Sequence, residues 1–157
     1  MANAFNRREI LMFFSATISV IAAPRLALAH ASQTGVSVDP KKVSRTVEIM
    51  MHEGEGKMSF SPAELRVKRG DTVRFVVQNH GALDHELVIV TFAGNAKHKL
   101  EMEKNPDMEH DDPNAVRVKP QADGTIVWQV TRRGKFEYAC LIPGHYEAGM
   151  KGVIVVE

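Results

Sequence analysis

The chain has 157 residues with 20 basic and 19 acidic side chains, which gives a formal net charge of +1. This length provides for one domain with a hydrophobic core, and the balanced charge argues against a nucleic-acid partner. No apolar run beyond the N-terminal region approaches the ~18 residues of a membrane span, so we expect none in the mature chain.

The first 29 residues have the pattern of a signal peptide. The paired arginines Arg7 and Arg8 precede an apolar run over residues 10–23, and Ala27 and Ala29 fit the A-x-A cleavage rule. The apolar run is too short to cross a bilayer comfortably. The arginine pair resembles a twin-arginine export signal, with Sec export as the alternative. Residues 1–29 are therefore expected to direct export to the periplasm.

Residues 30–42 are polar and are expected to form a flexible lead-in to a single domain over residues 43–157. The first strand is predicted at "VSRTVEIMM", residues 43–51, where apolar and polar side chains alternate. The run "HELVIV", residues 85–90, is typical of a strand buried on both faces. Runs rich in β-branched residues between turn signals predict further strands at 64–68, 72–79, 115–119, 124–130, 134–140 and 151–157.

The pattern changes between residues 91 and 120. "AKHKLEMEK", residues 96–104, has helical spacing, whereas "NPDMEHDDPN", residues 105–114, contains prolines and acidic residues that interrupt regular structure. We expect a short helix and then a loop. Seven or eight short strands with one helical and loop insertion predict an all-β fold, a Greek-key β-sandwich.

The chain has one cysteine, Cys140, whereas exported proteins commonly pair their cysteines in disulfides. It lies in "CLIPGHYEAGM" together with His145 and Met150, on the loop between the last two predicted strands. One turn can therefore present all three side chains to one point. Such soft donors select copper, and two histidines, one cysteine and a long axial methionine form blue-copper electron-transfer sites. Taken singly, each of these residues would more often be an ordinary packed side chain. Their occurrence together on one turn indicates a metal-binding site.

A second histidine must reach the same end of the sandwich from another strand. His85 is the better candidate, because it opens the predicted strand at residues 85–90 and its backbone would be held in the sheet. His80, five residues earlier in "NHGALD", is the alternative.

Further thioether and imidazole groups lie outside this set, and thioethers suit Cu(I). A solvated histidine or a packed methionine is the ordinary explanation for each one. Whether they bind extra copper is left open by the sequence. They include His30, His52, His98, His110, Met102 and Met108.

The motif C-x-x-P-G-H-x-x-x-x-M, residues 140–150, resembles the C-terminal copper loop of the cupredoxins, the plastocyanin and azurin family. The segment "FSPAELRVKRGDTVRFVVQNHGALDHELVIV" is similar to the first half of that family. The resemblance covers roughly residues 46–157. It implies a cupredoxin-like sandwich and one copper with ligands His85, Cys140 and His145 and with Met150 axial.

The resemblance also implies a type 1 copper centre that transfers one electron. Its partner would be a redox protein such as a cytochrome or a copper-handling protein, and we expect a monomer. Four filled ligand positions leave no open position for a substrate, so we do not expect an enzyme. Residues 141–143 either ring His145 as a docking patch or close the core. The alternative function is a periplasmic copper-tolerance protein that uses the extra Met and His groups to handle copper.

Overall fold

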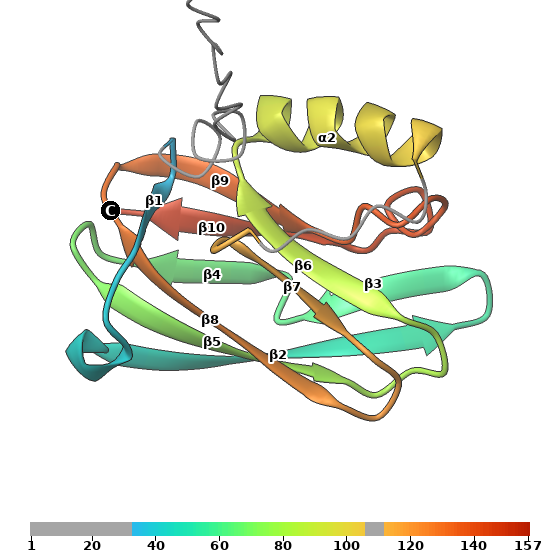
Figure 1. Ribbon diagram of the computed structural model, residues 1–157, viewed down its shortest axis with the longest axis horizontal. Coiled ribbons are helices and arrows are strands. Elements are labelled where there is room, and N and C mark those ends of the chain that lie inside the picture. The colour runs from blue at the N-terminus through green and yellow to red at the C-terminus, as the bar shows by residue number, and fades with distance from the viewer. Residues whose placement is uncertain (1–32, 106–111) are drawn as a thin grey trace, which may run out of the picture.

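The computed structural model describes residues 33–105 and 112–157, which form two β-sheets and one α-helix (Figure 1). The helices are the 3-10 turn η1 (Pro40–Lys42) and α2 (Phe92–Lys104). The strands are β1 (Gly35–Ser37), β2 (Arg45–Gly54), β3 (Lys57–Ser61), β4 (Glu64–Val67), β5 (Thr72–Asn79), β6 (His85–Val90), β7 (Ala115–Val118), β8 (Asp123–Val130), β9 (Gly134–Ala139) and β10 (Lys151–Val156). The first sheet has the order β1-β8-β5-β2-β3, and the second has the order β4-β10-β9-β6-β7.

The chain passes repeatedly between the two sheets, so neighbouring strands are often distant in sequence. β2 pairs in parallel with β5, β10 pairs in parallel with β4, and the remaining pairs are antiparallel. This two-layer arrangement confirms the predicted all-β Greek-key sandwich.

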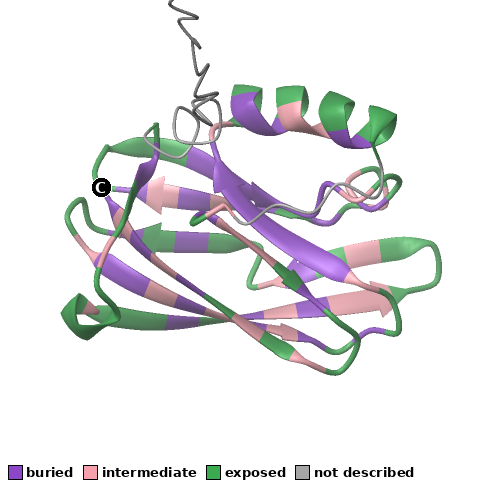
Figure 2. Cartoon of the chain, in the orientation of Figure 1, coloured by how far each residue is buried: buried purple, intermediate pink, exposed green. Residues whose placement is uncertain are grey.

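The core forms because alternate side chains on each strand face the opposite sheet. On β2, Val47, Ile49 and Met51 are buried, whereas the residues between them are exposed or half-buried. Figure 2 shows this alternation as buried and exposed bands along the strands. Phe75 and Trp128 are among the largest fully buried side chains. A buried apolar side chain of this size contributes about 1.5–3 kcal/mol.

The strand β6 is buried along its whole length, as its sequence predicted (Figure 2). Leu87 and Ile89 belong to the core between the sheets. Val88 and Val90 belong to a second cluster that includes Met102 of α2. The helix therefore covers the outer face of β6, which explains why this strand carries no polar alternation.

Two strands lie where none was predicted. β3 pairs with β2 as a hairpin after Gly56, whose φ of +65° suits a glycine in a tight turn. β1 pairs with β8, and η1 follows it, so the described part of the expected lead-in over residues 30–42 is structured. Gly35 permits this pairing because its backbone lies directly against Gln129 and Trp128. The predicted signal peptide and His30 lie outside the described residues.

The helix α2 begins four residues before the predicted start at residue 96. Thr91 is the N-cap, and its side chain accepts a hydrogen bond from the Gly94 amide at 3.0 Å, which satisfies one of the free donors of the first turn. The expected loop after it falls largely on residues 106–111, outside the described part. No helix within the described ranges is long and apolar enough to cross a membrane.

The pairing of β1 with β8 can be tested by Gly35→Ala. A Cβ at this position would overlap the carbonyl oxygen of Gln129 and the Trp128 indole, so we expect the free energy of unfolding to fall by about 1–3 kcal/mol. Urea unfolding followed by Trp128 fluorescence measures the change. Gly54→Ala is the control, because a Cβ there meets nothing closer than 3.8 Å. Equal stability of the two variants would contradict the pairing of β1 with β8.

Candidate metal centre

The loop between β9 and β10 is held closed by its own backbone. The Cys140 amide donates to the Met150 carbonyl at 3.1 Å, and the Met150 amide donates to the His145 carbonyl at 3.1 Å. Gly144 has a φ of +88°, a left-handed conformation that favours glycine. The turn thus brings the backbones of Cys140, His145 and Met150 to the same end of the sandwich, as the sequence predicted.

The strand β6 lies beside β9 and supplies the second histidine. The pairs Val88 with Ala139 and Ile89 with Tyr138 set the register. Just beyond the pair of Val88 with Ala139, near the start of β6, the Glu86 amide donates to the sulfur of Cys140 at 3.4 Å. His85 therefore stands next to the cysteine although 55 residues separate them in the sequence.

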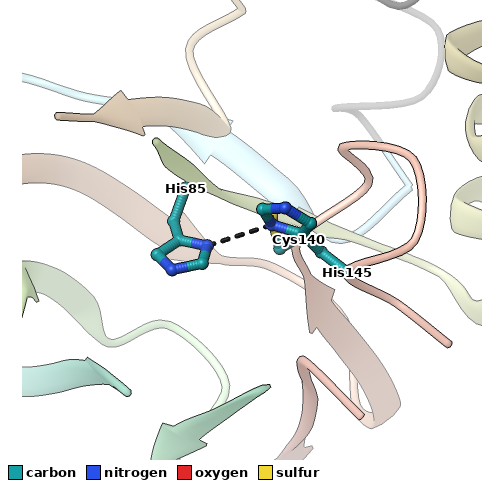
Figure 3. A group of neighbouring side chains, drawn as sticks. All are labelled: His85, Cys140 and His145. Atoms are coloured by element: carbon teal, nitrogen blue, oxygen red, sulfur yellow. Dashed lines mark hydrogen bonds between the residues drawn. The ribbon is translucent and has the colours of Figure 1, made fainter. Parts of the chain in front are cut away.

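Three donor atoms meet at this point (Figure 3). His85 Nδ1 lies 3.1 Å from His145 Nδ1, and the Cys140 sulfur lies 3.3 Å from the same nitrogen. Donor atoms of all three residues lie within 4.8 Å of one another. The two imidazole rings meet edge to face at 64°. Atoms at such separations can share one metal ion, and a thiolate with two imidazoles suits copper.

The centre is almost closed to water. His85 and Cys140 have no exposed surface, and His145 is 9% exposed. Met150 is fully buried and belongs to the same core cluster as Cys140. Met150 lies on the same loop as Cys140 and His145, as an axial ligand would. That its sulfur binds the metal remains a prediction.

Burial also sets the protonation of the centre. It raises the pKa of the Cys140 thiol to about 12, an effect that the Glu86 amide partly opposes. Burial, and then the charge of His85 when protonated, lowers the pKa of His145. A lowered pKa favours the neutral imidazole, whose lone pair can bind a metal, whereas the thiol must release its proton to solvent when it binds one.

The other candidate residues lie elsewhere. His80 is exposed and its ring contacts His52, with centroids 5.7 Å apart, so it is not part of the group around Cys140. Met102 of α2 is fully buried in the cluster between the helix and the sheet and acts as core filling. His98 lies half-buried on α2. Met108 and His110 fall outside the described residues.

Residues 141–143 were expected either to form a docking patch around His145 or to close the core, and they differ in which they do. Leu141 is 1% exposed and belongs to the cluster beneath α2, so it closes the core. Ile142 is half-buried and Pro143 is exposed. Only the last two can contribute to a surface beside His145.

Two carboxylates that were not predicted lie beside the centre. Glu86 is buried, and its side chain accepts from the Leu141 amide at 2.9 Å. Glu53 accepts from His85 Nε2 at 3.0 Å and from the amides of Ala82 and Leu83 at 2.9 Å. The bond from Leu83, and to a lesser degree those from His85 and Ala82, hold the pKa of Glu53 below its usual range against the opposing effect of burial.

A signal for Glu53 was present in the sequence. Residues 47, 49, 51 and 53 have the same parity, and the first three are the inward-facing apolar residues of β2. An acidic residue that continues such a row marks a polar contact inside the fold. The predicted strand ended at residue 51, whereas β2 continues to Gly54 and includes Glu53.

A two-sheet sandwich with a histidine, cysteine and histidine group at one end defines a copper-binding β-sandwich protein. The family model of copper binding proteins of the plastocyanin/azurin family matches residues 47–157. The chain belongs to this family, which confirms the resemblance seen in its motifs. It accordingly has one copper centre.

Relatives of this chain are named for copper resistance. The copper-resistant cuproprotein CopI of Rubrivivax gelatinosus is 51% identical over 130 residues, which cover 82% of this chain and 77% of that protein. The protein of the same name from Pseudomonas aeruginosa is 33% identical over 158 aligned residues, covering 82% and 85% of the two chains. Among solved structures, auracyanin B has a TM-score of 0.64 at 26% identity and covers 79% of this chain and 96% of its own.

The protonation of Cys140 can be tested after copper is removed with a chelator. With its pKa raised from 9.0 to about 12, the folded chain at pH 8 holds about 1000-fold less thiolate than an ordinary cysteine would. Its reaction with an aromatic disulfide reagent should be much slower than in urea, because the thiolate is scarcer and burial also blocks access. The rate should keep rising above pH 10, where the rate in urea levels off. A plateau near pH 9 in the folded chain would contradict the raised pKa.

Proposed function

We propose that this chain is an exported mononuclear type 1 copper protein that mediates one-electron transfer through His85, Cys140, His145 and Met150. When bound, copper supplies the one-electron change between Cu(I) and Cu(II). The observation that carries the proposal is the convergence of three donor atoms within 4.8 Å in a buried site. Donors held by two sheet-anchored segments need little movement when the charge of the metal changes.

The chemistry of the donors supports a carrier and not an enzyme. Met150, fully buried on the same loop, is proposed as the axial fourth donor. Four protein donors would leave no position open for a substrate. Within residues 33–105 and 112–157, His85, Cys140 and His145 are the sole group of three or more His, Cys, Asp or Glu side chains placed to hold a metal.

The surface near the centre supports a protein partner. Pro143 is exposed and Ile142 half-buried on the loop that carries His145, and Leu83 is 46% exposed on the loop before His85. Apolar side chains of this kind suit transient docking. We propose that a redox protein such as a cytochrome docks here on the monomer, in the periplasm, after export by residues 1–29.

Substitution of each proposed ligand tests the site. Wild-type protein loaded with copper should bind one equivalent and show an intense thiolate-to-copper band in the visible spectrum. Cys140→Ser should abolish the band, because the thiolate is lost, and His85→Ala should abolish or strongly shift it. His80→Ala is the matched control and should leave it unchanged, since that ring lies outside the group. Survival of the band in Cys140→Ser would disprove the assignment.

A second candidate function is copper tolerance through copper binding. The names of the CopI relatives favour it, and so does the surface pair of His52 and His80. His52 lies in β2 and His80 directly follows β5, the parallel neighbour of β2, and their rings are 5.7 Å apart at 80°. Two imidazoles from neighbouring strands offer nitrogen donors for a further copper ion. Met102 is too deeply buried to join such a site.

Copper titration separates the two functions. A copper-handling protein should take up a second equivalent, which His52→Ala and His80→Ala weaken at least tenfold without changing the visible band. His98→Ala, on α2, is the matched control. Equilibrium dialysis against a competing chelator measures each equivalent. Binding of one copper only, with fast reversible electron exchange with a cytochrome, would favour the electron carrier.

A further inference from the structure

We propose that Glu53 is a positioning residue of the copper centre, which orients His85 and favours Cu(II) over Cu(I), so that it lowers the reduction potential. The inference rests on the proposed ligand set. It concerns a residue from β2, in the sheet opposite the ligands.

The two nitrogens of His85 face different partners. Nδ1 lies on the side of the metal group, 3.1 Å from His145 Nδ1, and Nε2 lies 3.0 Å from Glu53 Oε1. If Nδ1 binds the metal, Nε2 carries the hydrogen and donates it to the carboxylate. A carboxylate in this place selects the tautomer, fixes the ring and makes the histidine a stronger donor.

The carboxylate is itself held in place. Its Oε1 also accepts from the amides of Ala82 and Leu83, each at 2.9 Å. A Cβ on Gly81 would overlap this carboxylate, so the absent side chain makes room for it. Asn79 secures the same loop, accepting from the Gly81 amide at 2.9 Å and donating to the Leu83 carbonyl at 2.8 Å.

Burial makes this contact matter for the metal. The His85 side chain is 0% exposed and that of Glu53 is 23% exposed. The imidazole hydrogen therefore depends on Glu53 for its partner. A negative charge so close to a ligand stabilises the more highly charged metal ion, because screening by water is weak in a partly buried site.

Removing the charge while keeping the shape tests the role. Glu53→Gln should lower Cu(II) affinity by about 10- to 100-fold and Cu(I) affinity less, so the reduction potential should rise. Each tenfold difference between the two losses corresponds to ~59 mV. Glu53→Ala, which also removes the acceptor, should raise the potential further. Glu48→Gln, an exposed acidic residue of the same strand, is the matched control and should leave the potential unchanged.

A measurement on the wild type keeps the proposal testable even if the variants fail to fold. In the diamagnetic Cu(I) protein, nitrogen-15 NMR should show His85 protonated at Nε2, with a slowly exchanging imidazole hydrogen. A His85 ring protonated at Nδ1, or an Nε2 hydrogen in fast exchange, would overturn the proposal.

The outcomes also distinguish this inference from the proposed function. If Glu53→Gln keeps the thiolate-to-copper band and the potential stays unchanged or falls, the role of Glu53 is wrong and the ligand set stands. If the wild type lacks the band, the ligand set is wrong and the inference is overturned with it.

Discussion

The metal centre depends on the register between β6 and β9. Val88 faces Ala139 across the ladder, which places Cys140 beside the start of β6 and brings its sulfur to the Glu86 amide. A slip of one residue would turn the alternating side chains of one strand to the opposite face. The apolar run Leu87–Val90 in β6 would not resist such a slip by itself. Its two different neighbours, the core on one face and α2 on the other, supply the missing constraint through side-chain packing.

That same burial imposes an electrostatic demand on the centre. A thiol with a pKa near 12 and a histidine with a lowered pKa are both kept neutral by the surrounding protein. On binding copper, Cys140 would release its proton and the thiolate would be paired with a positive ion, so metal binding would also stabilise the folded state. The buried site would therefore accommodate the thiolate and the metal ion together better than it would accommodate either charge alone.

The helical insertion is tied to the copper loop by polar contacts. Tyr146 donates to Glu137 at 3.0 Å, and Asn95 of α2 donates to the other oxygen of the same carboxylate at 2.9 Å. Lys99 of α2 forms an ion pair with Glu147. The helix thus braces the loop that carries His145, and it covers the outer face of β6 as well.

The sequence by itself determined the alternation that makes strands, the sandwich class and the local spacing of Cys140, His145 and Met150. These features depend on neighbours within one strand or one turn, where period and reach are set by backbone geometry. The sequence also favoured His85 over His80, because His85 opens a predicted strand. Tertiary structure alone decided that β1 joins the first sheet beside β8 and that Glu53 contacts His85 in particular. Glu53 and His85 are 32 positions apart, and Gly35 and Val130, which pair across β1 and β8, are 95 apart. Such contacts depend on which strands pair and in what register, which no local pattern specifies.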